Sequence, residues 1–195
     1  MNALVVSMAL ALVQTTTPPA SAPQAAAKPA ATGPVVVLDT TLGTIKIELD
    51  REKAPLSVDN FLKYVKAKHY DGTIFHRVIP GFMVQGGGMD ATMKEKPTSP
   101  PIKNEAKNGL RNVRGSLSMA RLNAPDSATA QFFINVKDNP GLDFGINGAG
   151  YAVFGRVVEG MAVVDQIVAA RTTSKGHYEN VPIAPIVIRT ARLAQ

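Results

Sequence analysis

The chain has 195 residues, of which 45% are hydrophobic and 18% charged, and its formal net charge is +6. This length suits one globular domain with a terminal extension, and a core of that size needs no disulfide or metal. The absence of cysteine excludes thiol catalysis, cysteine-based zinc sites and disulfides. The basic residues form no arginine-rich run and no stripe interleaved with aromatic residues, so we expect a solvated basic surface and no nucleic-acid partner.

The N-terminal segment is typical of an exported protein. Its first 27 residues carry no charged side chain, and the apolar residues 3–13 would span roughly 17 Å as a helix, too short for a bilayer core of ~30 Å. We predict a signal peptide over residues 1–27 and a periplasmic or secreted protein without a stable membrane anchor. No Lys or Arg precedes the apolar run, so an uncleaved tail is the alternative. Residues 28–34 read as a Pro/Ala-rich linker and residues 35–195 as the folded domain.

The folded domain opens with a predicted hairpin followed by a helix. Residues 35–39 are mostly β-branched, and residues 44–49 alternate apolar and polar side chains after a Thr-Leu-Gly turn, which indicates two paired strands. Next, Val58, Phe61, Leu62 and Val65 recur at helical spacing and predict one apolar stripe. Pro55 fits the first turn of that helix, where its missing N–H costs nothing.

Short strands dominate the rest of the chain. Residues 73–85 predict two strands around a Pro-Gly bend, and the polar, Pro-rich residues 89–112 predict a long loop. The remaining elements are expected strands at 115–120, 131–136, 152–157 and 185–193, a Gly-rich turn at 143–150, and a second short helix beginning at residue 161. Many short strands with two helices far apart in sequence argue for an antiparallel sheet closed as a barrel. Periodicity alone leaves a β-sandwich open.

The stretch from Phe75 to Gly87 is the most informative for chemistry. It carries Arg77, an amide and large apolar residues on adjoining strands. Residues two apart in a strand share a face, so Met83 points the same way as Gln85. Such a surface would combine an apolar pocket, amide donors and one fixed cation. Taken singly, however, the apolar residues are more often core and the arginine more often a surface ion pair.

Four segments in the same order resemble the signature of the cyclophilin family, especially its exported bacterial members. The matching runs are Phe75–Gly87, Ser118–Arg121, Gln131–Asn135 and Tyr151–Gly155, and the similarity extends from about residue 35 to residue 193. The resemblance implies a mainly β fold, a closed eight-stranded antiparallel barrel capped by two α-helices. It also implies peptidyl-prolyl cis/trans isomerase activity at a site on the outer face of the barrel.

The resemblance also assigns roles to individual residues. It makes Arg77 the catalytic residue and Gln85 the residue that positions Arg77. His76, beside Arg77, would help to orient the guanidinium. The other residues that it places around the substrate are Phe82, Met83, Phe133 and Leu142 in the proline pocket, and Ala120, Arg121, Gln131 and Tyr151 along the flanking groove and pocket wall.

Three positions depart from the pattern of many relatives. Tyr151 stands where a histidine is common, and its phenol offers a similar flat surface and donor. Arg121 stands where asparagine is common, at a position that contacts substrate through its backbone. Gly141 falls where eukaryotic members have tryptophan, an aromatic that contributes to cyclosporin binding. We therefore expect weak cyclosporin sensitivity and a more open pocket wall.

The predicted residues suit a reaction without covalent chemistry. Rotation about an X–Pro bond requires the nitrogen lone pair to leave conjugation, and a guanidinium aimed at that nitrogen favours the twisted state. We expect no cofactor and no metal, because the three histidines lack metal-ligand spacing, and neither a Gly-x-Ser-x-Gly elbow nor a phosphate loop occurs. The expected partners are proline-containing polypeptides, bound by a monomer. The alternative is a non-catalytic chaperone that binds proline-containing segments on the same fold.

Overall fold

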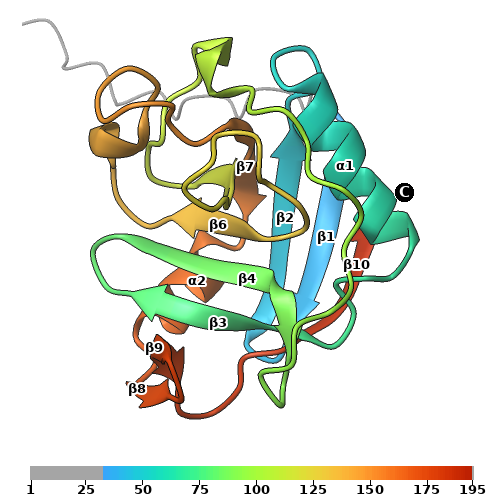
Figure 1. The fold of residues 1–195 in the computed structure, drawn as a ribbon. Coiled ribbons are helices and arrows are strands. Elements are labelled where there is room, and N and C mark those ends of the chain that lie inside the picture. The colour runs from blue at the N-terminus through green and yellow to red at the C-terminus, as the bar shows by residue number, and fades with distance from the viewer. Residues whose placement is uncertain (1–32, 195) are drawn as a thin grey trace, which may run out of the picture. The chain divides into compact units, whose positions relative to one another are not determined.

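Eight strands form one antiparallel sheet in the computed structural model, which describes residues 33–194 (Figure 1). They are β1 (Val35–Thr40), β2 (Gly43–Leu49), β3 (Thr73–Ile79), β4 (Met83–Asp90), β5 (Ser116–Met119), β6 (Phe132–Asn135), β7 (Val153–Glu159) and β10 (Ile188–Leu193). Their order in the sheet is β10-β1-β2-β7-β5-β6-β4-β3. The predicted strands are confirmed, and β10 and β3 are the two edges of the sheet.

The edge strands β3 and β10 come together and nearly close the sheet into a barrel. An antiparallel bridge joins Ile74 to Val187, and the backbone N–H of Gly72 donates to the carbonyl of Ile188 at 2.8 Å. Because closure removes the exposed edges that a sandwich would keep, these contacts decide for the barrel. Inward-facing side chains such as Leu38, Ile45 and Phe154 are fully buried in its core.

Two helices pack their apolar stripes against this core. In α1 (Pro55–Lys66) the predicted stripe is buried, and α2 (Met161–Val168) buries Val164 and Ile167. The N-terminus of α1 has no capping side chain of its own. Instead, the Glu105 carboxylate accepts hydrogen bonds from the backbone N–H of Leu56 at 3.0 Å and of Ser57 at 2.8 Å. This distant cap ties the long loop after β4 to the helix.

Two further strands lie outside the main sheet and were not predicted. They are β8 (Thr172–Lys175) and β9 (Tyr178–Pro182), which form a two-stranded hairpin at the end of the barrel beyond β3 (Figure 1). Their polar sequences carry little of the apolar alternation that marks a half-buried strand. Short 3₁₀ turns occur at η1 (Ala106–Asn108) and η2 (Pro140–Leu142).

The predicted signal peptide, residues 1–27, lies outside the described residues, as does the predicted linker except for residues 33 and 34. The carbonyl of Pro34 accepts a hydrogen bond from the N–H of Leu49 at 2.9 Å, so the described chain joins the sheet just before β1. Between residues 33 and 194, no helix is long and apolar enough to cross a membrane.

Candidate active site

A β-bulge in β3 turns Arg77 out of the barrel. Phe75 pairs with Gly86 and Arg77 pairs with Gln85, so β3 carries one residue more than β4 between these pairs. As a result Phe75 and Val78, three residues apart, both face the core, whereas Arg77 is exposed. Strict alternation would have placed Phe75 and Arg77 on the same face. Bulges commonly re-aim a side chain next to a functional site in this way.

Arg77 lines a cavity of about 270 Å³ together with apolar side chains from β4, β6 and the turn η2. This is slightly below the ~300–1,000 Å³ typical of pockets for drug-sized ligands. The other lining residues are Phe82, Met83, Gln85, Ala120, Arg121, Phe133, Leu142 and Tyr151. Nine of the eleven predicted site residues therefore meet at one cavity. Met83 and Phe133 are almost fully buried yet contribute to its wall.

Two side-chain amides lead from the guanidinium toward an adjoining hollow. Arg77 Nη1 lies 3.5 Å from Gln85 Oε1, and Gln85 Nε2 donates to Gln131 Oε1 at 2.8 Å. The Gln131 side chain packs closely over Gly88 of β4, so a Cβ added at Gly88 would approach it to 2.6 Å. Gln131 itself lines an adjoining hollow rather than the cavity. The amides thus hold Arg77 from one side with dipoles, not with a counter-ion.

His76 lies inside the protein, directly before Arg77, and does not line the cavity. It is only 4% exposed, and its Nδ1 has no hydrogen-bond partner in the described part of the chain. Burial lowers the pKa of His76 to about 4, against the opposing effect of hydrogen bonds with the backbone of Ile74 and the side chain of Gln131. The imidazole is therefore neutral near pH 7 and adds no charge beside Arg77. Its predicted role in orienting Arg77 stays a prediction.

Two of the positions that depart from the family pattern contact each other. The guanidinium of Arg121 lies 4.4 Å from the centre of the Tyr151 ring, and its Nε donates to the carbonyl of Gly150 at 2.9 Å. Tyr151 in turn meets Phe133 edge to face, with ring centres 5.7 Å apart. A cation over an aromatic face is a favourable contact. Arg121 therefore forms part of the cavity wall with its side chain, not only with its backbone.

The wall formed by η2 is held by a buried polar network that the sequence did not reveal. Asn139 Nδ2 donates to the Phe82 carbonyl at 2.8 Å and to Asn135 Oδ1 at 2.7 Å. Asp143, which follows Leu142, accepts from the backbone N–H of Asn112 at 2.7 Å. Burial would raise the pKa of Asp143, but hydrogen bonds from Asn112 and Arg111 outweigh it and lower the pKa. The network joins both walls of the cavity.

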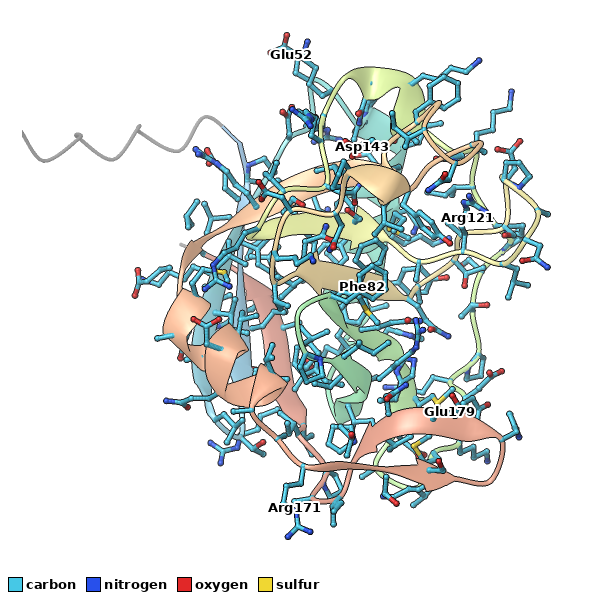
Figure 2. All side chains as sticks on the ribbon, turned by 90° about the vertical axis from the view of Figure 1, so that its left-hand side faces the viewer. Glu52, Phe82, Arg121, Asp143, Arg171 and Glu179 are labelled. Atoms are coloured by element: carbon cyan, nitrogen blue, oxygen red, sulfur yellow. The ribbon has the colours of Figure 1, made fainter. Side chains whose placement is uncertain are left out.

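Gly141, the third departure, lies in η2 but does not line the cavity. In Figure 2, Phe82, Arg121 and Asp143 lie in the middle and upper part of the view, and Arg171 lies at its lower end. Another cavity of about 320 Å³ is lined in part by Glu48 and Arg156, which form an ion pair at 2.6 Å, and by none of the predicted residues. Within residues 33–194 no cluster of three or more acidic or histidine side chains could hold a metal ion.

Comparison with known proteins identifies this arrangement. The profile of the family "Cyclophilin type peptidyl-prolyl cis-trans isomerase/CLD" matches residues 35–193. The chain belongs to this family. It is 58% identical over 164 residues to peptidyl-prolyl cis-trans isomerase A of Dickeya dadantii, covering 84% of this chain and 86% of the relative. It is 50% identical over 164 residues to peptidyl-prolyl cis-trans isomerase B of Escherichia coli, covering 83% and 100%.

Solved cyclophilins share the fold. A crystal structure of a cyclophilin-type isomerase from Cryptosporidium parvum, determined in the presence of the dipeptide Ala-Pro, matches with a TM-score of 0.69 and 26% identity. The match covers 83% of this chain and 99% of that one. A cyclophilin from Hirschia baltica matches with a TM-score of 0.66 and 27% identity over 80% of this chain and 72% of its own. The family and the fold expected from the sequence are both confirmed.

Proposed function

We propose that this cyclophilin-type isomerase accelerates rotation of X–Pro bonds in polypeptides, with Arg77 stabilising the twisted prolyl amide. The observation that carries the proposal is the meeting of Arg77 with Phe82, Met83 and other apolar side chains at one cavity. The apolar part of its wall, formed by Phe82, Met83, Phe133 and Leu142, suits a proline ring. The Cryptosporidium parvum relative studied with Ala-Pro supports proline-containing peptides as ligands.

The chemistry needs position and charge rather than a nucleophile. The X–Pro amide is held planar by resonance with a barrier of ~18–20 kcal/mol, and it turns over uncatalysed in tens to hundreds of seconds. Lowering ~100 s to ~10 ms requires roughly 5–6 kcal/mol. In the twisted state the nitrogen lone pair is localised, so a nearby guanidinium stabilises that state more than the planar one. Arginine stays charged at every relevant pH.

The charge of Arg77 is available for this role. Among the described residues, the ion pairs involve other side chains, and the one side-chain hydrogen bond of Arg77 is to the amide oxygen of Gln85. Since the amide oxygen that accepts from Arg77 carries no net charge, the guanidinium is oriented without its charge being cancelled. The backbone of the groove would hold the peptide carbonyls while the apolar wall grips the ring.

The test is a proline-peptide isomerisation assay on the wild type, Arg77→Ala and Arg77→Lys. We expect Arg77→Ala to lower kcat/KM by ~10²–10³, the range for loss of one preorganised donor, and Arg77→Lys to recover only part of the loss because it lacks the planar fork. Arg171→Ala, at the far end of the molecule (Figure 2), is the matched control and should keep full activity. If the peptide isomerised no faster with the wild-type protein than in buffer alone, the proposed isomerase activity would be refuted.

The second candidate is a chaperone that binds proline-containing segments without isomerising them. It is favoured by the apolar part of the cavity wall, which would bind such segments whether or not Arg77 acts on them. Suppression of client aggregation distinguishes the two. A chaperone loses this activity when Phe133 is replaced by Ala and keeps it in Arg77→Ala, whereas the isomerase assay responds to both substitutions.

We also propose that the protein assists the folding of exported proteins. The support is the uncharged N-terminal run of 27 residues with small residues at its end. N-terminal sequencing of the protein recovered from the producing cell tests whether the N-terminal segment is removed, as export by a signal peptide requires. A mature protein that begins between residues 21 and 35 is expected, and an intact Met1 in all recovered protein would contradict export by this route.

A further inference from the structure

The cavity carries more positive charge than isomerisation by Arg77 requires. Its charged lining residues are Arg77 and Arg121, and its lining contains no carboxylate. An adjoining hollow of about 390 Å³ shares Gln85, Ala120 and Arg121 with the cavity and adds Glu95 and Lys96. The two spaces together therefore present three cations and one carboxylate. Arg121 is the only charged residue common to both linings, so it stands on the ridge between them.

Arg121 is fixed in place without being neutralised. Besides Tyr151 and the carbonyl of Gly150, it binds the carbonyl of Leu122, to which its Nη1 donates at 2.9 Å. All these partners are neutral. Its Nη2 has no acceptor within the described residues, and the side chain is only partly buried. A rigid guanidinium whose Nη2 is free to donate is suited to bind a carboxylate of a ligand.

The second cation of the hollow is also held by neutral groups. Lys96 Nζ donates to the carbonyls of His69 and Asp71, the latter at 3.1 Å, and forms no ion pair with a described residue. The single carboxylate, Glu95, is exposed and accepts a long contact of 3.5 Å from the Tyr178 hydroxyl. The field at the ridge is therefore positive, with Arg77 and Lys96 on its two sides.

We propose that Arg121 is a specificity-determining residue that selects polypeptide segments with Asp or Glu close to the proline. This inference rests on the proposed function, since it assumes that the proline ring occupies the cavity lined by Arg77. An extended chain advances about 3.3–3.6 Å per residue, so a side chain one or two residues from that proline reaches the ridge. There a ligand carboxylate accepts from the free Nη2 of Arg121, whereas a Lys or Arg side chain of the ligand is repelled by three like charges.

Charge-matched peptides test the proposal in the isomerisation assay. Two series place Glu, Gln or Lys immediately before proline, or one residue earlier, in an otherwise neutral peptide. In 20 mM salt we expect kcat/KM for Glu to exceed that for Lys by about three- to tenfold in at least one series, with Gln between them. In 1 M salt, where the Debye length is ~3 Å, the ratio should fall below about twofold.

Variants assign the discrimination to Arg121. Arg121→Gln should reduce the Glu/Lys ratio to less than half of its wild-type value, whatever its effect on the neutral peptide, and Arg121→Lys should keep part of it. Arg171→Gln removes one exposed charge at the far end of the molecule (Figure 2) and should leave the ratio unchanged. The salt titration of the wild type needs no variant, so it tests the electrostatic origin even if Arg121→Gln fails to fold.

Two results would overturn the proposal. One is a wild-type enzyme that turns over Glu, Gln and Lys peptides at equal rates in low salt. The other is a Glu preference that survives Arg121→Gln unchanged. Failure of the proposed function gives a different outcome, because the neutral Gln peptide would then isomerise no faster than in buffer.

Discussion

Replacing Asn139 with alanine should loosen the two walls of the cavity that Arg77 lines, without altering Arg77 itself. Asn139 is 7% exposed and donates two hydrogen bonds, to the carbonyl of Phe82 at 2.8 Å and to Asn135 Oδ1 at 2.7 Å. Its carbonyl also accepts from the N–H of Leu142 at 2.9 Å. Because Phe82 and Leu142 belong to different walls, the Asn139 side chain fixes the width of the cavity from behind.

Asn139→Ala leaves Asn135 Oδ1 without a donor, whereas the Phe82 carbonyl keeps a hydrogen bond from the N–H of Val136 at 3.1 Å. A buried polar group left unsatisfied costs about 1–3 kcal/mol and the lost bond to Phe82 about 0.5–1.5 kcal/mol, so we expect the free energy of unfolding to fall by about 2–4 kcal/mol. For a domain of this size each kcal/mol lowers Tm by about 2–4 °C. KM for a proline peptide should rise about three- to tenfold, and kcat should change less, because the amides that hold Arg77 remain in place.

Urea unfolding and steady-state isomerisation measure both effects. Asn139→Asp keeps the volume but removes the donors, so it should be at least as destabilising as Asn139→Ala if the hydrogen bonds are the cause. Asn147→Ala removes an exposed amide from the neighbouring loop, 3.2 Å from the carbonyl of Gly141, and should change stability by less than about 0.5 kcal/mol. An Asn139→Ala protein with wild-type stability and wild-type KM would refute the reasoning.

Three further substitutions test single features. Glu105→Ala removes the cap of α1 and should cost about 1.5–3 kcal/mol in urea unfolding at unchanged activity, whereas the exposed Glu52→Ala should cost under about 0.5. The buried His76 has a pKa of about 4, so the folded state binds its proton less readily than the unfolded chain. Stability should therefore fall as pH drops below about 6.5, by about 2 kcal/mol at pH 5, and urea unfolding at pH 7 and 5 should show a smaller fall for His76→Gln. Gly88→Ala should displace Gln131 and lower kcat/KM about three- to tenfold, yet should have little effect in a Gln131→Ala background, and an equal loss in both backgrounds would contradict this.

Local patterns predicted the elements whose packing is decided by local sequence. The alternation over residues 44–49 and the stripe of α1 each present one apolar face, and both are buried as expected. The hairpin of β8 and β9 lacks such a face, so no periodic signal marked it. Closure as a barrel depends on contacts between the two edges of the sheet, such as the bridge between Ile74 and Val187. Hydrophobic periodicity does not encode such contacts.

The candidate site was assembled from sequence through the family resemblance rather than through side-chain geometry. Alternation alone would have put Arg77 on the same face as Phe75, and only the bulge in β3 reverses this. The contact between Arg121 and Tyr151 joins residues 30 positions apart, and Glu105 caps a helix 48 residues before it. These partners meet because the barrel brings distant loops together, so no local spacing announces them.

The choice of amides behind Arg77 fits a reaction that moves no proton. A carboxylate in place of Gln85 would form an ion pair with the guanidinium, and at 3.5 Å its attraction would oppose the pull of Arg77 on the prolyl nitrogen. The Gln85 side chain instead accepts from Arg77 and donates to Gln131, which leaves the net charge of the guanidinium unchanged. The neutral state of His76 serves the same end, since a second cation behind Arg77 would repel it from its place. The charge that we propose to be catalytic is thus held by an amide dipole on one side, and no described carboxylate pairs with it.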